Sequence, residues 1–323
     1  MKLGNVVVSA AGAAAARTVE SYRPEGERLF DDRFARDLLP PVWRFVVDLL
    51  RVPGLGTALL ALRERRFPGV LGNLICRTRF IDDSLRAALK QDLRQVVILG
   101  AGFDSRAYRI PGIEGAHVFE VDHPDTQAWK QERLRRVRGT LPAHVAFVPI
   151  DFDRQRLEDA MAAQGFRTGV ETFFVWEGVT QYITAEAVDA TFRYVSQAAG
   201  AGSEIVFTYI HRGIIDGYAR SDMDRRLVSL TRRFGMPWIF GIDPGEVGEY
   251  LAARGLDLVD HVGPAEYRAR YLDPLGRQMS IFAGERIALA RVAGTEQAER
   301  REELYPIQED RRSANRDDTI DAG

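Results

Sequence analysis

Three acidic residues follow apolar runs that have the composition of buried strands, and they are the first candidates for chemistry. Asp122 ends the run at 117–121, while Asp151 and Glu177 each directly follow a later run. If these runs are parallel strands of one sheet, their carboxyl ends meet at the edge where open α/β sheets bind ligands. We therefore expect three carboxylates around one crevice, an arrangement that suits a cationic ligand.

A glycine-containing turn directly follows the apolar run VVIL. Gly100 and Gly102 have no side chain to hold a ligand away from the backbone, and Asp122 stands where a ribose diol is bound. The pattern departs from the dinucleotide fingerprint, because Ser105 occupies the third glycine position and Asp104 would face a pyrophosphate. It favours a nucleotide-like cofactor without a pyrophosphate, such as S-adenosylmethionine (SAM). The structural alternative is that Asp104 or Ser105 only caps the next helix.

The elements that must position these residues alternate along the chain. Strands are predicted at 96–100, 117–121, 145–150, 172–176, 204–210, 256–262 and 279–289. Helices are predicted at 104–109, 124–138, 154–164, 185–199 and 244–254. This alternation predicts an α/β fold, a Rossmann-like parallel sheet with helices on both faces, whose last strand returns antiparallel.

Three regions flank or interrupt this core, which spans residues 95–293. Residues 1–94 are predicted to form a helical N-terminal cap, a longer preface than dinucleotide-binding domains often have. Residues 211–245 break the alternation with glycines and a proline, which predicts a lid-like insertion. The tail at 294–323 is rich in charge. We expect these apolar side chains of the insertion to cover an acceptor pocket: Ile214, Tyr218, Phe234, Trp238 and Phe240.

Composition excludes several classes of function. The formal net charge of −2 gives no electrostatic reason to expect nucleic acid as a partner. No apolar run approaches the roughly 18 residues that cross a bilayer, so we expect no membrane partner and a cytoplasmic location. The single cysteine, Cys76, excludes an intrachain disulfide, and the five histidines lack metal-ligand spacing, so no metal is expected. The sequence carries no signal for an oligomeric state.

Taken as a set, these motifs resemble a known family. RTRFIDD, GAGFDSR, FEVDHPDTQAWK, DFD and WEGVTQY, in this order, look like the leucine carboxyl methyltransferase family. The family comprises class I SAM-dependent methyltransferases and includes bacterial polyketide O-methyltransferases. The resemblance runs from about Arg17 to the last strand and is closest to the bacterial small-molecule branch. It implies a class I methyltransferase sheet, SAM as the cofactor and a small-molecule acceptor as the partner.

The resemblance implies a role for each matching residue of the cofactor site. Arg77 would bind the carboxylate of SAM's methionine part in a fork-to-fork contact, with Arg17 as a second partner; Arg77 also reads as an exposed helix arginine. Gly100 and Gly102 would let the backbone approach the methionine and the ribose. Asp122 would accept both ribose hydroxyls, and its alternative role is to cap the following helix.

Four further residues receive roles from the same resemblance. Asp151 would meet the adenine amino group with Phe152 against the ring, unless Asp151 is an ordinary loop carboxylate. Glu177 would lie near the methionine amino group or the sulfonium, and Tyr182 near the acceptor. A buried glutamate beside a tryptophan is also compatible with a purely structural role.

The predicted reaction is methyl transfer from SAM to an oxygen of a small molecule. A carboxylate acceptor is ionised at neutral pH and needs no general base, whereas a phenol needs one, for which His211 and His123 are candidates. The family likeness favours the carboxylate. Two alternatives come from other classes of protein. An NAD(P)-dependent oxidoreductase is favoured only by the glycine turn and Asp122, and the other alternative is a non-catalytic SAM-binding module.

Overall fold

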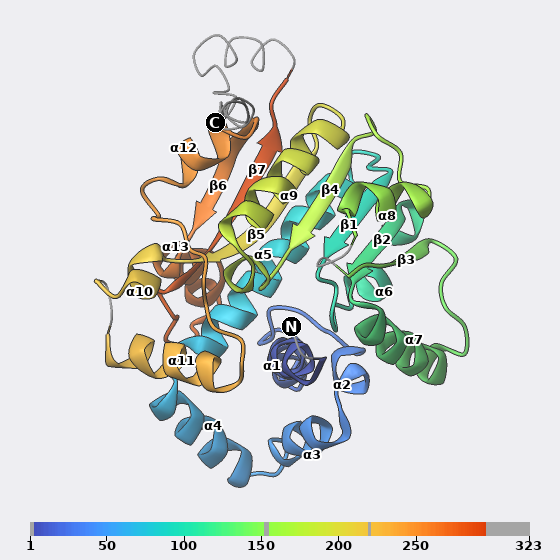
Figure 1. The fold of residues 1–323 in the computed structure, drawn as a ribbon. Coiled ribbons are helices and arrows are strands. Elements are labelled where there is room, and N and C mark those ends of the chain that lie inside the picture. The colour runs from blue at the N-terminus through green and yellow to red at the C-terminus, as the bar shows by residue number, and fades with distance from the viewer. Residues whose placement is uncertain (1–2, 152–154, 219–220, 295–323) are drawn as a thin grey trace, which may run out of the picture.

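A computed structural model describes residues 3–151, 155–218 and 221–294, and within them one seven-stranded sheet lies between two layers of helices (Figure 1). The strand order is β3-β2-β1-β4-β5-β7-β6. The first five strands are parallel, and β7 is antiparallel to both of its neighbours, which confirms the predicted fold class. The strands are β1 Gln95–Leu99, β2 His117–Asp122, β3 Val145–Pro149, β4 Thr172–Trp176, β5 Glu204–Ile210, β6 Leu256–Val262 and β7 Glu285–Val292.

Helices cover both faces of the sheet, so its central strands are apolar on both sides. Val97 in β1 lies opposite Phe119 in β2 and Phe174 in β4, and all three are fully buried. The α-helices are α1 Leu3–Ser21, α2 Ala35–Leu38, α3 Pro41–Leu49, α4 Leu55–Arg66, α5 Val70–Leu89, α6 Arg106–Arg109, α7 Pro124–Arg138, α8 Leu157–Ala163, α9 Ala185–Ala198, α10 Arg212–Asp216, α11 Asp222–Arg233, α12 Val247–Ala252 and α13 Pro264–Tyr267. Shorter 3₁₀ and π turns are η1 Ile113–Gly115, η2 Thr180–Tyr182, η3 Arg268–Leu272 and η4 Asp273–Leu275.

Among the residues that the structure describes, five α-helices precede β1, and two of them matter for the site. The buried apolar face of α5, which includes Ile75 and Ile81, belongs to the same core as Ile98 of the sheet. Helix α1 packs against α5, and its small residues Ala11 and Ala14 are fully buried in that core. The N-terminal segment is thus held against the carboxyl ends of the strands by ordinary apolar burial.

The last predicted strand is only half right, because β7 begins at Glu285 and not at residue 279. The backbone N–H of Phe282 donates to the carbonyl of Gly69 at 2.9 Å, just before α5 begins. The Phe282 ring lies in a small apolar cluster with Ile210 and Val228. Residues 280–282 therefore lie against the start of α5, and pairing beside β5 begins only at Gly284, whose carbonyl accepts from the N–H of His211 at 2.8 Å.

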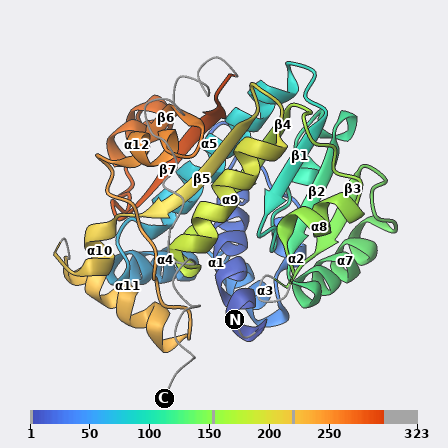
Figure 2. The same ribbon diagram turned by 45° about the horizontal axis from the view of Figure 1, so that its top comes forward.

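The segment after β5 contains α10 and α11, and α11 lies next to α4 in both ribbon views (Figures 1 and 2). Its two ends are held together, because the N–H of Ile242 donates to Ile210 and the N–H of Arg212 donates to Ile242, each at 3.1 Å. The chain thus leaves and rejoins the sheet at one point. Across the described ranges, no helix has the length and apolar character needed to cross a membrane.

Candidate functional site

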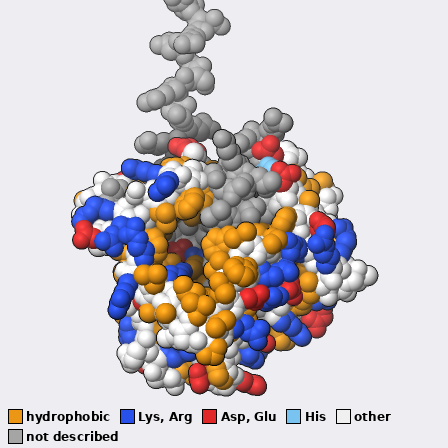
Figure 3. Space-filling model, turned by 90° about the horizontal axis from the view of Figure 1, so that it is seen from below, with side chains coloured by type: hydrophobic (Ala, Val, Ile, Leu, Met, Phe, Trp, Pro, Cys, Tyr) orange, Lys and Arg blue, Asp and Glu red, His pale blue; other side chains and the backbone are white. Residues whose placement is uncertain are grey.

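A cavity of about 970 Å³ lies at the carboxyl ends of the parallel strands. The face seen in Figure 3 is hollowed there and bordered by hydrophobic side chains. The walls come from strand ends, from α1 and α5, and from the segment after α11. Its volume is near the upper limit of small-molecule sites, so it has room for a cofactor together with a second molecule.

The glycine turn forms one wall of this cavity. Gly100 has a φ of 67° and Gly102 a φ of 40°, values that side chains rarely allow. A Cβ on Gly100 would lie 2.4 Å from Cγ2 of Val179, and one on Gly102 would lie 3.2 Å from Cβ of Ala10. Both positions therefore need glycine for conformation and for space.

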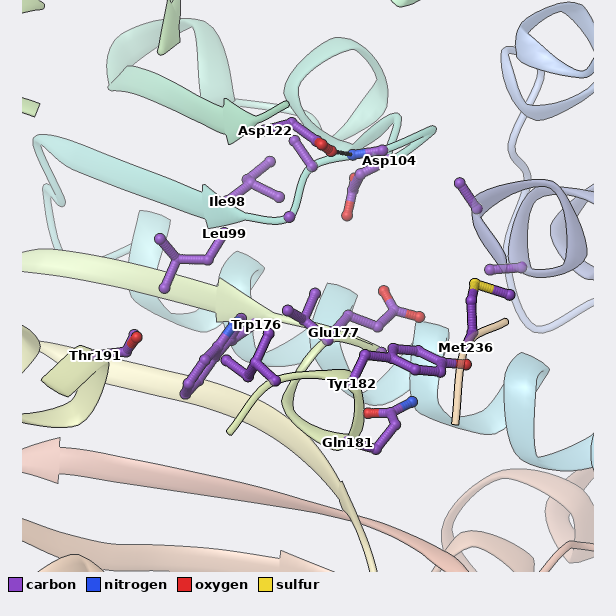
Figure 4. Close-up of a pocket in the computed structure, with 18 of the residues that line it drawn as sticks. Ile98, Leu99, Asp104, Asp122, Trp176, Glu177, Gln181, Tyr182, Thr191 and Met236 are labelled. Carbon is purple, nitrogen blue, oxygen red and sulfur yellow. Dashed lines mark hydrogen bonds between the residues drawn. The ribbon is translucent and has the colours of Figure 1, made fainter. Parts of the chain in front are cut away.

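Asp122 lies beside the glycine turn and faces the cavity (Figure 4). Its Oδ2 accepts a hydrogen bond from the N–H of Gly102, and its Oδ1 accepts one from the N–H of His123 at 2.6 Å. Burial raises the pKa of this carboxyl. The capping alternative is wrong, because the ring of His123 caps α7 by accepting from the N–H of Asp125.

The nucleotide end of the predicted site continues from Asp122 to the end of β3. Asp151 lines the cavity there, and its N–H donates to Oε1 of Gln155 at 3.0 Å. Buried Ile150 and Leu157 line the same region. Phe152, predicted to lie against the adenine ring, falls outside the described residues.

Arg77 is buried and lines the cavity, so its interpretation as an exposed helix arginine is wrong. Its Nε donates to Glu177 at 2.8 Å, and its Nη1 donates to both carboxylate oxygens of Glu285 at 2.7 Å. Within the described residues, Nη2 has no hydrogen-bond partner. Because Nε and Nη1 already donate to the two glutamates, only Nη2 is available to a ligand. The predicted fork-to-fork contact, which uses two nitrogens, is therefore not available.

Glu177 lies between two buried arginines. It accepts from Arg77 and, at 2.7 Å, from Nη1 of Arg106. These two guanidinium groups oppose the effect of burial and hold the pKa of Glu177 well below its usual range. A carboxylate that is paired in this way is a weak base, so its first effect is to fix the position of Arg77.

The ion pairs continue from Arg106 to the N-terminal helix. Asp82 pairs with Arg106 at 2.9 Å and with Arg109 at 2.6 Å. Asp32 in turn pairs with Arg17 at 2.8 Å, and Nη2 of Arg17 donates to the carbonyl of Phe103 at 2.5 Å. Arg17 thus ties α1 to the glycine turn and also lines the cavity.

Asp104 occupies the position where a dinucleotide would need a free amide. Its Oδ1 accepts from the N–H of Arg106 at 2.7 Å, at the start of α6. Ser105 instead donates its hydroxyl to Asp32 at 2.5 Å. Asp104 therefore accepts from the first N–H of α6, as the capping interpretation predicts, whereas Ser105, the N-cap residue, makes no capping bond with its side chain. The amide that a pyrophosphate would bind is already used.

The other half of the cavity is formed mainly by residues that the sequence did not single out. Tyr182 and Gln181 follow β4 and lie across the cavity from Asp122 (Figure 4). The apolar side chains of this half come from the start of α5, from β5, from the segment 227–239 and from the loop before β7: Val70, Ile210, Leu227, Met236, Trp238, Ile239 and Phe282.

Of the five apolar residues predicted to cover the acceptor, only Trp238 lines the cavity. Ile214 is buried in the small cluster with Phe282, and Phe240 is buried in the main core. Tyr218 and Phe234 are exposed. Composition marks these residues as apolar, but it does not tell which of them face a cavity, a core or the solvent.

His211 is not among the residues that line the cavity. Its Nδ1 accepts from the N–H of Gly213 at 2.9 Å and so caps α10. We therefore withdraw it as a candidate catalytic base. His123 does line the cavity, but it lies at the nucleotide end beside Asp122.

Carboxylates outnumber arginines around the cavity. Among the described lining residues, six are acidic and three are arginines: Asp104, Asp122, Asp151, Glu158, Glu177 and Glu285 against Arg17, Arg77 and Arg156. This surplus of negative charge fits a cofactor that carries a sulfonium and an ammonium group. In the part of the chain that the structure describes, no group of three or more His, Cys, Asp or Glu residues is placed to hold a metal ion.

Comparison with known proteins decides the family. Residues 10–196 match the leucine carboxyl methyltransferase family. The chain belongs to this family. The matched region holds the glycine turn, Asp122, Asp151, Arg77 and Glu177, so the sequence resemblance is confirmed.

Curated relatives agree with this family and name its cofactor. A Bacillus subtilis (strain 168) protein, YktD, is 30% identical over 209 residues, which cover 64% of this chain and 68% of YktD. A Rhodococcus jostii (strain RHA1) protein is 32% identical over 225 residues, which cover 69% of this chain and 70% of the relative. Both are provisionally named S-adenosyl-L-methionine-dependent methyltransferases. The chain is accordingly a SAM-dependent methyltransferase.

Solved structures support the fold alone. A crystal structure provisionally titled a methyltransferase from Thermobifida fusca YX aligns with a TM-score of 0.51 at 17% identity, covering 86% of this chain and 94% of that one. A Streptomyces avermitilis structure aligns with the same TM-score at 14% identity, covering 85% and 96% of the two chains.

The polar residues of the site that the sequence analysis missed include Glu285 and Asn73. Glu285 begins β7 and lies opposite Ile210, so this antiparallel strand brings its first residue to the edge where the parallel strands end. Asn73 lies one helical turn before Arg77 on α5, and its Nδ2 donates to Glu285. Asn73 could have been predicted as a site residue, because its spacing from Arg77 places both on one face of a helix. Glu285 could not be predicted without knowing where β7 begins.

Proposed function

We propose that this methyltransferase transfers the methyl group of SAM to a carboxylate oxygen of a small, largely apolar molecule, such as a polyketide-like natural product. In this proposal the ribose lies at Asp122, the adenine at Asp151 and the methionine carboxylate at Nη2 of Arg77. Arg17 would be a second partner of that carboxylate. The acceptor would then occupy the other half of the cavity, beside Tyr182.

One observation carries the choice of a carboxylate. No described residue in the acceptor half is a free general base, because Glu177 and Glu285 are both ion-paired with Arg77 and no histidine lines that half. A phenol with a pKa near 10 needs proton removal, whereas a carboxylate is ionised at neutral pH. An acceptor that needs no base therefore fits these residues better.

The chain's own residues would act by placement. When bound, SAM supplies a methyl group on a positively charged sulfur, which a carboxylate oxygen accepts without any proton transfer. Glu177 would hold Arg77 in place, and Tyr182 would orient the acceptor. Holding two reactants in line can supply most of the rate in such a reaction.

The nature of the methylated atom is tested by the stability of the product. The enzyme is incubated with methyl-labelled SAM and a panel of aromatic and aliphatic carboxylic acids and phenols, and each product is treated with mild alkali. We expect label in acid products that alkali releases as methanol, because methyl esters hydrolyse and aryl methyl ethers do not. Label that resists alkali, or that appears only with phenols, would refute the carboxylate proposal.

A further inference from the structure

The outward sides of α3 and α4 are apolar, although a surface helix usually turns its polar side outward. On α3, Val42, Phe45 and Val46 are exposed, and their spacing places them on one face of the helix. Of the 13 large hydrophobic side chains that are exposed among the described residues, six lie between residues 42 and 62, so this exposure is concentrated in one segment. We call these six the α3–α4 surface: Val42, Phe45, Val46, Val52, Leu55 and Leu62.

The charged groups around the α3–α4 surface leave it positive. Residues 41–67 include two acids, and each already has a partner. Asp48 accepts from Nη2 of Arg36 at 2.6 Å, and Glu64 accepts from the N–H of Gly69 at 2.8 Å. Three arginines of the same segment are exposed: Arg51, Arg65 and Arg66. The exposed charge beside the apolar side chains is therefore cationic.

Helix α11 carries a row of arginines that faces the end of α4. A groove of about 490 Å³ lies between the two helices, and four arginines line it: Arg66, Arg225, Arg226 and Arg233. Asp222, the single acid among the described lining residues, pairs with Arg225. In the part of the chain that the structure describes, the side chains of Arg226 and Arg233 make no hydrogen bond or ion pair. This arginine groove therefore carries a surplus of positive charge, and guanidinium groups suit phosphate oxygens.

The cavity opens on the side of the molecule that carries these helices. In Figure 1, α3, α4 and α11 lie at the lower side, and Figure 3 views the molecule from there, with hydrophobic and basic side chains around the hollow. Leu227 of α11 and Ile239 line the cavity, and Ile239 is 48% exposed, so it lies at the mouth. A partner that contacts α4 and α11 is therefore next to the mouth of the cavity.

An apolar surface beside arginines matches the interface of a bilayer that contains anionic lipids. At such an interface, apolar side chains enter the acyl boundary while arginines approach the phosphates. A second copy of this chain fits less well, because a two-fold contact brings the same arginines together.

We propose that the α3–α4 surface and the arginine groove together bind the surface of an anionic membrane. Binding of this kind uses helices that lie on the bilayer, so it needs no membrane-spanning helix. The expectation of no membrane partner rests on the lack of a long apolar run, and it does not extend to such a contact. The mouth of the cavity then opens towards a phase in which an apolar acceptor dissolves. The inference holds whichever atom is methylated, and so it goes beyond the proposed function.

The test measures binding of the full chain to two kinds of vesicle by co-sedimentation. One kind is pure phosphatidylcholine, and the other contains about one-third phosphatidylglycerol. The anionic vesicles should bind the wild type at least about tenfold more tightly than the neutral ones, because several arginines contribute. Raising the salt from about 0.1 M to about 0.5 M should weaken this binding, since exposed charges are screened.

Two variants test the two parts of the surface. Arg226→Gln with Arg233→Gln should weaken binding to anionic vesicles by about 25-fold, because each arginine near such a surface contributes roughly fivefold. Phe45→Ser should weaken it by at least about fivefold, because an apolar ring no longer enters the acyl boundary. Both variants should bind S-adenosylhomocysteine as the wild type does, which shows that they have folded.

Matched controls lie elsewhere on the molecule. Arg94 and Arg167 are exposed and precede β1 and β4, at the edge of the sheet opposite the cavity. Changing both to glutamine removes the same charge as the groove variant. Val259 is 45% exposed on β6, and Val259→Ser is the control for Phe45→Ser. Both controls should bind anionic vesicles as the wild type does.

Each outcome decides the inference separately from the proposed function, because the assay contains neither SAM nor an acceptor. The inference is overturned by no binding to anionic vesicles, by equal binding to both kinds of vesicle, or by equal losses in the variants and their controls. Light scattering that shows a dimer in the wild type and a monomer in Phe45→Ser also overturns it, since a second copy then covers the surface. Failure to form methyl esters from the acid panel refutes the carboxylate proposal and leaves the membrane contact standing.

Discussion

The proposed role of Arg77 can be separated from its structural role by changing the protein and the ligand together. Arg77→Lys keeps a positive charge between Glu177 and Glu285. A lysine has three N–H donors, the same number of hydrogen bonds that Arg77 makes to these two glutamates, so none is left for a ligand. The matching change in the ligand is S-adenosylhomocysteine without its carboxylate.

The expected magnitude follows from the one nitrogen that remains available. Among the described residues, Nε and Nη1 of Arg77 have partners and Nη2 has none, so Arg77 offers the ligand carboxylate one charge-assisted contact. Such hydrogen bonds contribute about 1.5–3 kcal/mol, which is roughly a 10- to 150-fold change in Kd. Removing the carboxylate should therefore weaken binding to the wild type by at least about tenfold more than it weakens binding to Arg77→Lys, in which only the contact with Arg17 is lost.

Calorimetry on the four protein–ligand pairs gives the coupling between Arg77 and the carboxylate, because general damage to the site affects both ligands equally. Arg79→Lys is the matched control, since Arg79 is about one-third exposed and pairs with Asp83 on its own helix. It should retain the wild-type ratio. A coupling below twofold, or equal coupling for Arg77 and Arg79, would refute the assignment of the methionine carboxylate to Arg77.

Three further predictions concern the turn, the reaction and the acceptor half. Gly100→Ala should lower the affinity for S-adenosylhomocysteine by at least about tenfold, because its Cβ would overlap a valine methyl, whereas Gly112→Ala has a similar φ but open space and should bind normally. Unchanged binding by Gly100→Ala would contradict the geometry. Single-turnover methyl transfer should be nearly flat from pH 5.5 to 8, because the acceptor is ionised and the pKa of Glu177 is held low; a rise through pH 6–7 that a histidine variant abolishes would indicate a phenol. Trp238→Ala should raise the KM for the acceptor, while Phe234→Ala, on an exposed side chain, should not, as initial rates would show.

The parts of the site that follow from the sequence are those tied to strand ends. An apolar run such as VVIL predicts a buried strand, and the residue after it is then at the binding edge. Gly100, Asp122 and Asp151 were found in this way, and all three line the cavity. Their partners inside the site were not all predictable: Asn73 and Glu285 are 212 residues apart, and their contact depends on how β7 pairs.

Side-chain direction limited the remaining predictions. Ile214 lies in the short helix α10, and Trp238 and Phe240 lie in the irregular segment after α11. All three are apolar, and no periodicity separates the cavity-facing ring from the two core residues. His211 illustrates the same limit. It follows the last residue of β5, as a catalytic group would, but its ring turns back to cap α10.

A crystal structure with bound S-adenosylhomocysteine tests the central claim most directly, which is that the cavity is divided into a nucleoside end and an acceptor end. We predict the ribose hydroxyls within hydrogen-bond distance of the Asp122 carboxylate and the ligand carboxylate against Nη2 of Arg77, with the space beside Asn73 and Trp238 left open. Density for the adenosyl group between Asn73 and Trp238 would contradict the account.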